Sequence, residues 1–540
     1  MDHTKYTYPS RRSVTFARNG MVATSVPLAA HAGTEILRKG GNAADAAVAT
    51  AAALTVLEPP SNSLGSDCFA LLWMNGKLHG LNASGRAPRT LDAQTVRDLG
   101  HQQVPFRGWI PVMVPGAPAG WAEVIRKFGK LTLPEVLAPA IRYAREGYPV
   151  PVTTADLWQR TEQALRAAHG GPESCPPEFR GWYQVFAPSG HAPRAGELWR
   201  SEAMARTLER IAASGAADFY QGETARKLDA FSRATGGWLR AEDLADYRPA
   251  WVDPIHTEYR GCDVYEMPPN GHGITVLMAL NILKGLTLGA EKESVETYHS
   301  MIESLKLAYA DAKAFVADPA AMTARVETLL SPEYAARRRA VVRPDSACDP
   351  APGDPYCGDT VYLCTADGEG NMVSFIQSHY KDFGSWVVEP ETGVELQNRG
   401  ANFSLDPASP NCLAPGKKAY HTIIPGFLCR DGKALGPFGV MGGFMQPQGH
   451  LQVLVNLLDY HMNPQQALDA PRWQWTGGKV IQMEPGVPQP LVDALRAMGH
   501  EIEVVSDVTL MGRGEIILRD EQGVLCGASE PRCDGTVSCF

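Results

Sequence analysis

The sequence lacks the short motifs that mark several large enzyme classes. It contains no HExxH zinc motif, no GxxxxGK[ST] phosphate-binding loop and no GxSxG nucleophile elbow. No CxxC pair occurs, and the eleven cysteines are irregularly spaced. An odd number of scattered cysteines favours free thiols over a disulfide framework or a zinc site. We therefore expect neither a metal nor a cofactor.

Long apolar runs and blocks of one charge are also missing. No stretch approaches about 18 uncharged apolar residues, so no membrane span is expected. Residues 1–25 contain no apolar segment typical of a signal peptide, which favours a cytoplasmic location. The net charge is −9 and no basic cluster occurs, so nucleic-acid binding is disfavoured.

The composition that remains is that of a large globular protein. With 540 residues, 44% apolar and 20% charged, the chain can bury an extensive core. Length alone predicts about two to four domain-sized units or one large layered domain. Helical patterns dominate before an aperiodic Pro-, Asp- and Gly-rich stretch at 340–359, and strand-like runs dominate after it. This order favours helices layered over sheets within one domain.

Some elements can be predicted individually. The segment from Ala29 to Leu57 is expected to hold a start signal and one long helix, with Asn42 near the entry and a Pro-Pro stop after the helix. A hairpin is expected over 69–84, turning at Asn75-Gly76, and a helix over 450–460.

The segment 357–378, CGDTVYLCTADGEGNMVSFIQS, predicts a second hairpin with its turn at DGEG. Thr360 stands at the mouth of its first strand, directly after the aperiodic stretch. That placement suits an N-terminal nucleophile hydrolase, in which cleavage before a threonine frees an α-amine. With an ordinary pKa of about 7.7–8.0, this amine can accept the hydroxyl proton. Taken alone, the same pattern also fits a purely structural threonine.

Motifs along nearly the whole chain resemble those of the γ-glutamyltransferase family, in the family's order. They include GGNAADAAVATAAALTVLEP, SNSLGSDCFALLW, MPPNGHGITVLMALNILKG, DTVYLCTADGEGNMVSFIQS and GVMGGFMQPQGHLQVLVN. The resemblance implies an α+β fold, the four-layer αββα sandwich of N-terminal nucleophile hydrolases. It also implies self-cleavage of the Asp359–Thr360 bond, giving a large subunit, 1–359, and a small subunit, 360–540.

The same resemblance implies roles for four residues. Thr360 matches the nucleophile, and Ser378 matches the hydroxyl that contacts it. Gly442 and Gly443 match the oxyanion hole. Two glycines allow backbone N–H groups to approach a tetrahedral intermediate without interference from a Cβ atom.

The chain departs from the family at the positions that bind an amino-acid head group. Asn402 stands where the family has an acid for the α-amine, and His421 and Thr422 replace two serines that contact the α-carboxylate. Arg86 and Arg399 lie in the same segments. An arginine in a small pocket can bind a carboxylate with its planar fork, whereas an ammonium group needs an acid. These five residues therefore predict a substrate with a carboxylate and no α-amine.

Three functions stay open at this point. The first is an amidohydrolase acting on a small carboxylate-bearing amide, with oxamate as the leading candidate. The alternative is a γ-glutamyltransferase or glutathione hydrolase with a divergent head-group site, and the third is an uncut homologue that serves as a binding or scaffold protein. The expected partners are a small-molecule amide and the two subunits of one precursor, without nucleic acid or membrane. A homodimer of processed heterodimers is one option for the oligomeric state.

Overall fold

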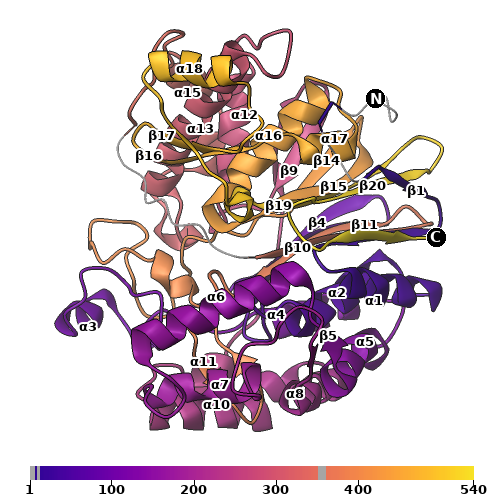
Figure 1. Ribbon diagram of the computed structural model, residues 1–540, viewed down its shortest axis with the longest axis vertical. Coiled ribbons are helices and arrows are strands. Elements are labelled where there is room, and N and C mark those ends of the chain that lie inside the picture. The colour runs from indigo at the N-terminus through magenta and orange to yellow at the C-terminus, as the bar shows by residue number, and fades with distance from the viewer. Residues whose placement is uncertain (1–6, 9–11, 351–359) are drawn as a thin grey trace.

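The computed structural model describes residues 7–8, 12–350 and 360–540. Within these residues, two seven-stranded antiparallel sheets lie face to face at the centre of the molecule (Figure 1). The β15 sheet has the order β1 (Thr15–Ala17), β20 (Leu525–Ser529), β19 (Arg513–Arg519), β15 (Lys433–Met441), β14 (Gly426–Arg430), β9 (Cys262–Glu266) and β8 (Ile255–Tyr259). The β10 sheet has the order β21 (Thr536–Cys539), β2 (Gly20–Thr24), β10 (Val361–Asp367), β11 (Met372–Ser378), β3 (Asp67–Met74), β4 (Lys77–Ala83) and β7 (Ala250–Val252).

Apolar side chains fill the space between the two sheets. Phe69, Tyr362 and Ile376 from the β10 sheet pack in one cluster with Phe427 and Ile517 from the β15 sheet. Both inner faces are apolar, as expected for stacked sheets about 10 Å apart. Both sheets are therefore closed to solvent on their inner side.

Helices cover the outer face of each sheet (Figure 1). Against the β10 sheet lie α1 (Pro27–Arg38), α2 (Ala43–Leu57), α4 (Ala117–Phe128) and α5 (Leu133–Glu146), with α6 (Val152–His169), α7 (Pro177–Phe186), α8 (Glu202–Ser214), α9 (Ala217–Gln221), α10 (Glu223–Ala234) and α11 (Ala241–Ala245) farther out. Against the β15 sheet lie α12 (Ile274–Leu283), α13 (Val295–Phe315), α16 (Gln446–Leu458) and α17 (Pro464–Asp469), with α15 (Pro332–Arg339) and α18 (Gln489–Ala497) nearby. This is the four-layer αββα arrangement predicted from the sequence.

The predicted helix over 29–57 is in fact two helices. α1 ends at Arg38, and Gly40 takes a left-handed backbone with φ +96° that breaks the helix. Asn42 then caps α2 by accepting hydrogen bonds from Ala44 N and Asp45 N. Every residue of α2 is buried, because its small side chains let it pack closely against β10 and β11. The single-helix prediction is wrong, whereas the start signal at Asn42 is confirmed.

Both predicted hairpins are present. β3 and β4 turn at Asn75 and Gly76, whose φ angles of 54° and 78° suit a type I′ turn. β10 and β11 pair over Val361–Ala366, and the carboxylate of Asp367 accepts backbone hydrogen bonds within the turn. The helix predicted over 450–460 is α16, which begins four residues earlier at Gln446.

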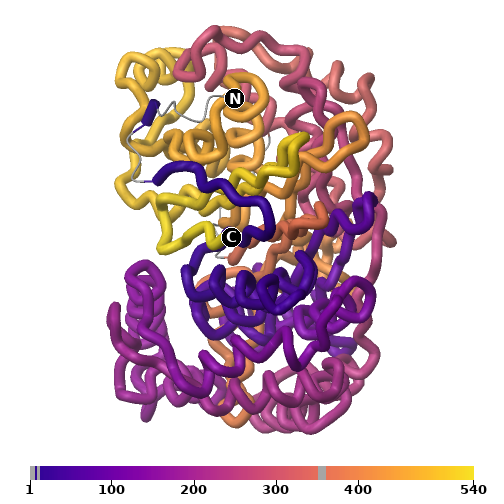
Figure 2. The backbone as a smooth tube through the Cα atoms, turned by 90° about the vertical axis from the view of Figure 1, so that its right-hand side faces the viewer, coloured from indigo at the N-terminus to yellow at the C-terminus, as the bar shows by residue number. Residues whose placement is uncertain are grey.

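Each sheet contains strands from before and from after residue 360, paired side by side. In the β10 sheet, β10 pairs with β2 on one side, and β11 pairs with β3 on the other. β21, near the C-terminus, pairs with β2, so residues 20–24 and 536–539 run side by side (Figure 2). No helix formed by the described residues has the length and apolar character needed to cross a bilayer.

Candidate active site

Thr360 and Ser378 meet at one end of the β10–β11 hairpin. Val361 is the register partner of Gln377, so the residues flanking this pair, Thr360 and Ser378, face each other. Both are fully buried, and Thr360 Oγ1 donates a hydrogen bond to Ser378 Oγ at 3.2 Å. The hairpin thus places one hydroxyl beside the other, as predicted.

Gln446 adds a second contact to Thr360 that the sequence analysis missed. It is the first residue of α16, and its Nε2 donates to Thr360 Oγ1 at 3.3 Å. Its Oε1 accepts from Ile424 N at 2.9 Å, which fixes the orientation of the amide. Gln446 lies three residues after the predicted oxyanion-hole glycines, within the motif GVMGGFMQPQGH.

Gly442 and Gly443 form the corner between β15 and α16. Their φ angles are +132° and +59°, which other residues rarely adopt. A Cβ atom at Gly442 would lie 3.1 Å from Gly512 Cα. The corner therefore requires glycine, and it brings the backbone to the end of the sheet where Gln446 contacts Thr360.

Arg399 is fully buried beside Thr360 and Ser378. Its Nη1 donates to Thr422 Oγ1 at 2.5 Å, and its guanidinium lies 4.5 Å from the ring centroid of Tyr380. Tyr380 N in turn donates to Ser378 Oγ at 2.7 Å. Arg399 Nε and Nη2 have no hydrogen-bond acceptor among the described residues. Burial lowers the pKa of Arg399 to about 10, with Asp67 opposing the shift, so the guanidinium stays charged at neutral pH.

Asp67 is the second residue that the sequence analysis missed. It is the first residue of β3 and the register partner of Ser378. Its carboxylate accepts from Gly85 N at 2.9 Å, from Gln397 Nε2 at 2.8 Å and from His421 Nε2 at 2.9 Å. The cue in the sequence is an acid at the start of an otherwise apolar strand.

Burial sets the charge of this Asp67–His421 pair. It raises the pKa of Asp67 to about 7, although the nearby Arg399 acts in the opposite direction. Burial also lowers the pKa of His421 well below its ordinary value, so the imidazole is neutral and donates from Nε2. His421 is therefore held by Asp67, and Thr422 is held by Arg399.

A cavity of about 760 Å³ opens next to this cluster. Its walls include Tyr380 and Asn402, and Asn402 Nδ2 has no acceptor among the described residues. Arg97 and Lys313 add positive charge to the lining, and Asp406 is the carboxylate in it. The cavity has the size of a site for a small organic ligand and a cationic character.

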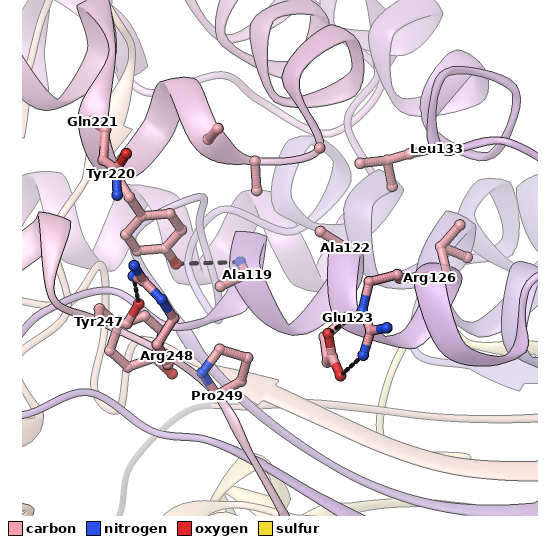
Figure 3. Close-up of a pocket in the computed structure, with 14 residues that line it drawn as sticks. Ala119, Ala122, Glu123, Arg126, Leu133, Tyr220, Gln221, Tyr247, Arg248 and Pro249 are labelled. Carbon is pink, nitrogen blue, oxygen red and sulfur yellow. Dashed lines mark hydrogen bonds and ion pairs between the residues drawn. The ribbon is translucent and has the colours of Figure 1, made fainter.

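A second cavity of about 500 Å³ lies apart from the nucleophile hairpin, between α4, α9 and residues 247–249 (Figure 3). Tyr220 accepts a hydrogen bond from Ala119 N there, and Glu123 pairs with Arg126. Its lining includes none of the residues predicted for the active site, whereas the lining of the cavity beside Tyr380 includes Asn402. The cavity beside Tyr380 is therefore the candidate substrate site.

Two predicted residues are not part of this cluster. The side chain of Arg86 is 55% exposed, donates to Gly416 O at 3.0 Å and lies 3.6 Å from Asp318. Its guanidinium thus has surface partners, and the geometry does not support it as a second carboxylate anchor. Asp359, the predicted residue before the scissile bond, lies outside the described residues.

Comparison with known proteins gives a consistent picture. A sequence profile described as gamma-glutamyltranspeptidase matches residues 29–540. The "Glutathione hydrolase-like YwrD proenzyme" of Bacillus subtilis is 37% identical, over 95% of this chain and 97% of that protein. The "Oxamate amidohydrolase proenzyme" of Klebsiella pneumoniae is 34% identical, over 96% of this chain and 98% of that protein. The crystal structure of a cephalosporin acylase from Bacillus halodurans is 55% identical and superimposes with a TM-score of 0.95, covering 100% of this chain and 99% of that one. These matches span nearly the whole sequence, and the chain belongs to the γ-glutamyltranspeptidase family of amide hydrolases.

Proposed function

We propose that the chain is a self-cleaving threonine amidohydrolase that acts on amides whose acyl part carries a carboxylate. Cleavage between Asp359 and Thr360 gives a large subunit, 1–359, and a small subunit, 360–540. The observation that carries the substrate assignment is Arg399, a buried cation with two N–H groups directed to no acceptor among the described residues.

The reaction follows from the groups around Thr360. Its hydroxyl oxygen attacks the amide carbonyl while the freed α-amine takes the hydroxyl proton. The N–H groups of Gly442 and Gly443 stabilise the oxyanion, and the amine leaves with the proton. Water then hydrolyses the acyl ester and releases the acid. Ser378 and Gln446 hold the threonine oxygen in place through their hydrogen bonds at 3.2 and 3.3 Å.

Arg399 selects the acyl group. A carboxylate that accepts from Nε and Nη2 would receive two parallel hydrogen bonds from the planar fork. Oxamate is the smallest amide of this kind, and the relative named for oxamate hydrolysis supports it as a candidate. Because the adjacent cavity measures about 760 Å³, longer monoamides of dicarboxylic acids belong to the same substrate class.

A second candidate is hydrolysis of γ-glutamyl compounds, favoured by the relative named glutathione hydrolase-like. Such substrates add an ammonium group. Asn402 carries no charge to bind it, and the carboxylate of Asp67 already accepts three hydrogen bonds. These contacts weigh against an α-amine in the site.

Two measurements test this proposal. Mass spectrometry of the purified protein should find a fragment that begins Thr-Val-Tyr, and Thr360→Ala should remain one chain. The cleaved protein should then hydrolyse oxamate or succinyl and glutaryl anilides faster than γ-glutamyl anilide. An intact but active chain would contradict the nucleophile assignment, and a preference for γ-glutamyl anilide would favour the second candidate.

A further inference from the structure

A cluster of buried polar side chains lies in the helical layer over the β15 sheet. His299, Glu303 and Lys306 come from α13, and His500 follows α18. All four are at least 97% buried. Nitrogen and oxygen atoms of His299, Glu303 and His500 lie within 4.8 Å of one another, a spacing that metal ligands also show.

The hydrogen bonds of the cluster leave no place for a metal ion. Lys306 Nζ lies 2.8 Å from Glu303 Oε1 and already neutralises the carboxylate. His299 Nε2 lies 2.6 Å from Arg343 O, which only accepts, so the imidazole proton is on Nε2. His299 Nδ1 therefore accepts from His500 Nε2 at 2.9 Å. The two nitrogens that would face a metal thus bind each other.

The outward hydrogen bonds of the cluster converge on one short segment of backbone, residues 343–348. Besides His299 binding Arg343 O, Lys306 Nζ donates to Cys348 O at 2.7 Å, and Glu303 Oε2 accepts from Cys348 N at 3.0 Å. Both backbone groups of Cys348 are therefore bound to the buried ion pair. Burying two charges is unfavourable unless both are well bound, and here the pair binds both backbone groups of a residue that lies in no helix or strand.

The position of residues 343–348 in the sequence indicates a role for the cluster. Cys348 lies twelve residues before Thr360, whereas the preceding helix, α15, ends 21 residues before it, at Arg339. We propose that His299, Glu303, Lys306 and His500 form an anchor that positions the chain for its own cleavage. This inference rests on the proposed self-cleavage before Thr360.

The step that the anchor serves is an acyl shift from nitrogen to oxygen. Thr360 Oγ1 attacks the carbonyl carbon of Asp359, an ester forms, and the C–N bond breaks as the hydroxyl proton passes to the new amine. Water then hydrolyses the ester and leaves the carboxyl group on Asp359. The attack needs the two atoms held in a near-attack arrangement, and the anchor fixes the backbone at Cys348, twelve residues before Thr360.

The test replaces the ion pair with apolar side chains of similar size, Glu303→Leu together with Lys306→Met. Such replacements of buried ion pairs are often neutral for stability, so folding should survive. The double variant keeps the contact of His299 to Arg343 O, 17 residues before Thr360 instead of twelve, so by loop closure alone it slows cleavage by less than about twofold. The two bonds to Cys348 also set the direction in which the backbone continues from that residue. Because the double variant loses them, we expect cleavage to be three- to tenfold slower. A pulse of cell-free synthesis, followed by denaturing gels and intact-mass measurement, gives the rate constant.

Two controls separate positioning from general damage. Lys292→Met removes another buried lysine, whose partners Glu293, Tyr298 and Pro471 O lie outside the anchored segment, and should leave the cleavage rate unchanged. Cys348→Ala keeps the backbone groups that the anchor binds and should also cleave normally. After full conversion, the double variant should turn over substrate within about twofold of wild type and melt cooperatively.

Several results would overturn the anchor. Cleavage of the double variant at the wild-type rate would remove its role, and equal slowing by Lys292→Met would reduce it to general stability. Cleavage that needs Zn²⁺ and stops on chelation would make the cluster a metal site. If the double variant fails to fold, His299→Leu, which removes the contacts to Arg343 O and to His500 but keeps the ion pair, must still slow cleavage. A wild-type chain that never cleaves would instead refute the proposed function.

Discussion

Replacing Arg399 is the most direct test of what the site binds. Arg399→Met keeps much of the buried volume but removes the charge and all five N–H groups. A hydrogen bond to a charged group contributes about 1.5–3 kcal/mol, so two bonds to a substrate carboxylate would contribute about 3–6 kcal/mol. At 1.4 kcal/mol per factor of ten, kcat/KM should fall about 10²–10⁴-fold. Arg399→Lys should recover little of this loss, because an ammonium group cannot supply the planar fork.

The assay compares each carboxylate-bearing amide with its methyl ester. Wild type should strongly prefer the free carboxylate, and Arg399→Met should lose most of that preference while its cleavage before Thr360 is checked by mass. Arg86→Met is the matched control, because this arginine is exposed and paired with Asp318. It should change kcat/KM by no more than about twofold. If Arg399→Met still preferred the carboxylate, another group would be the anchor and the substrate assignment would be refuted.

Three further predictions concern the nucleophile, the oxyanion hole and the buried acid. Thr360→Ala should stay uncut and inactive, and Thr360→Ser should cleave slowly, because serine keeps the hydroxyl without the methyl group that restricts χ1; intact-mass spectra check both. Gly442→Ala and Gly443→Ala should lower kcat about 10²–10³-fold, whereas Gly432→Ala, in an open turn with a similar positive φ, should not. Burial raises the pKa of Asp67 to about 7, so the folded chain holds this proton more tightly than the unfolded chain does. The melting temperature of wild type should therefore fall relative to Asp67→Asn as the pH rises from about 4 to about 7, and a constant difference would contradict this.

Local features of the sequence were enough to predict much of the fold. The two hairpins follow from alternating apolar residues and from turn residues such as Asn75-Gly76, and these cues act over a few positions. The break between α1 and α2 was missed although Arg38-Lys39-Gly40-Gly41 interrupts the apolar pattern, and the positive φ of Gly40 ends the first helix there. The order of the strands in each sheet depends on contacts between distant segments, which no local pattern contains.

The residues of the site also fall into those that the sequence predicted and those that it did not. Thr360 was predicted from its place between the aperiodic stretch and a strand together with the family resemblance, and Ser378 from its match to the family's motif. Asp67 was missed because its partners Gln397 and His421 are more than 300 residues away in sequence. Arg86 follows Gly85, whose N–H binds Asp67, and yet its side chain extends to the surface. Proximity in sequence to a buried contact does not determine which way the next side chain points.

The pairing of strands from before and after residue 360 within both sheets has a consequence for how the protein unfolds. If the chain is cut before Thr360, five ladders of backbone hydrogen bonds between the described strands still join the two products, and neither can leave without breaking all of them. Before the cut, refolding is a unimolecular reaction. After it, two different polypeptides must find each other, and recovery depends on their concentration. Cleavage would thus convert a protein governed by a folding equilibrium into one whose lifetime is set by the rate of its first unfolding.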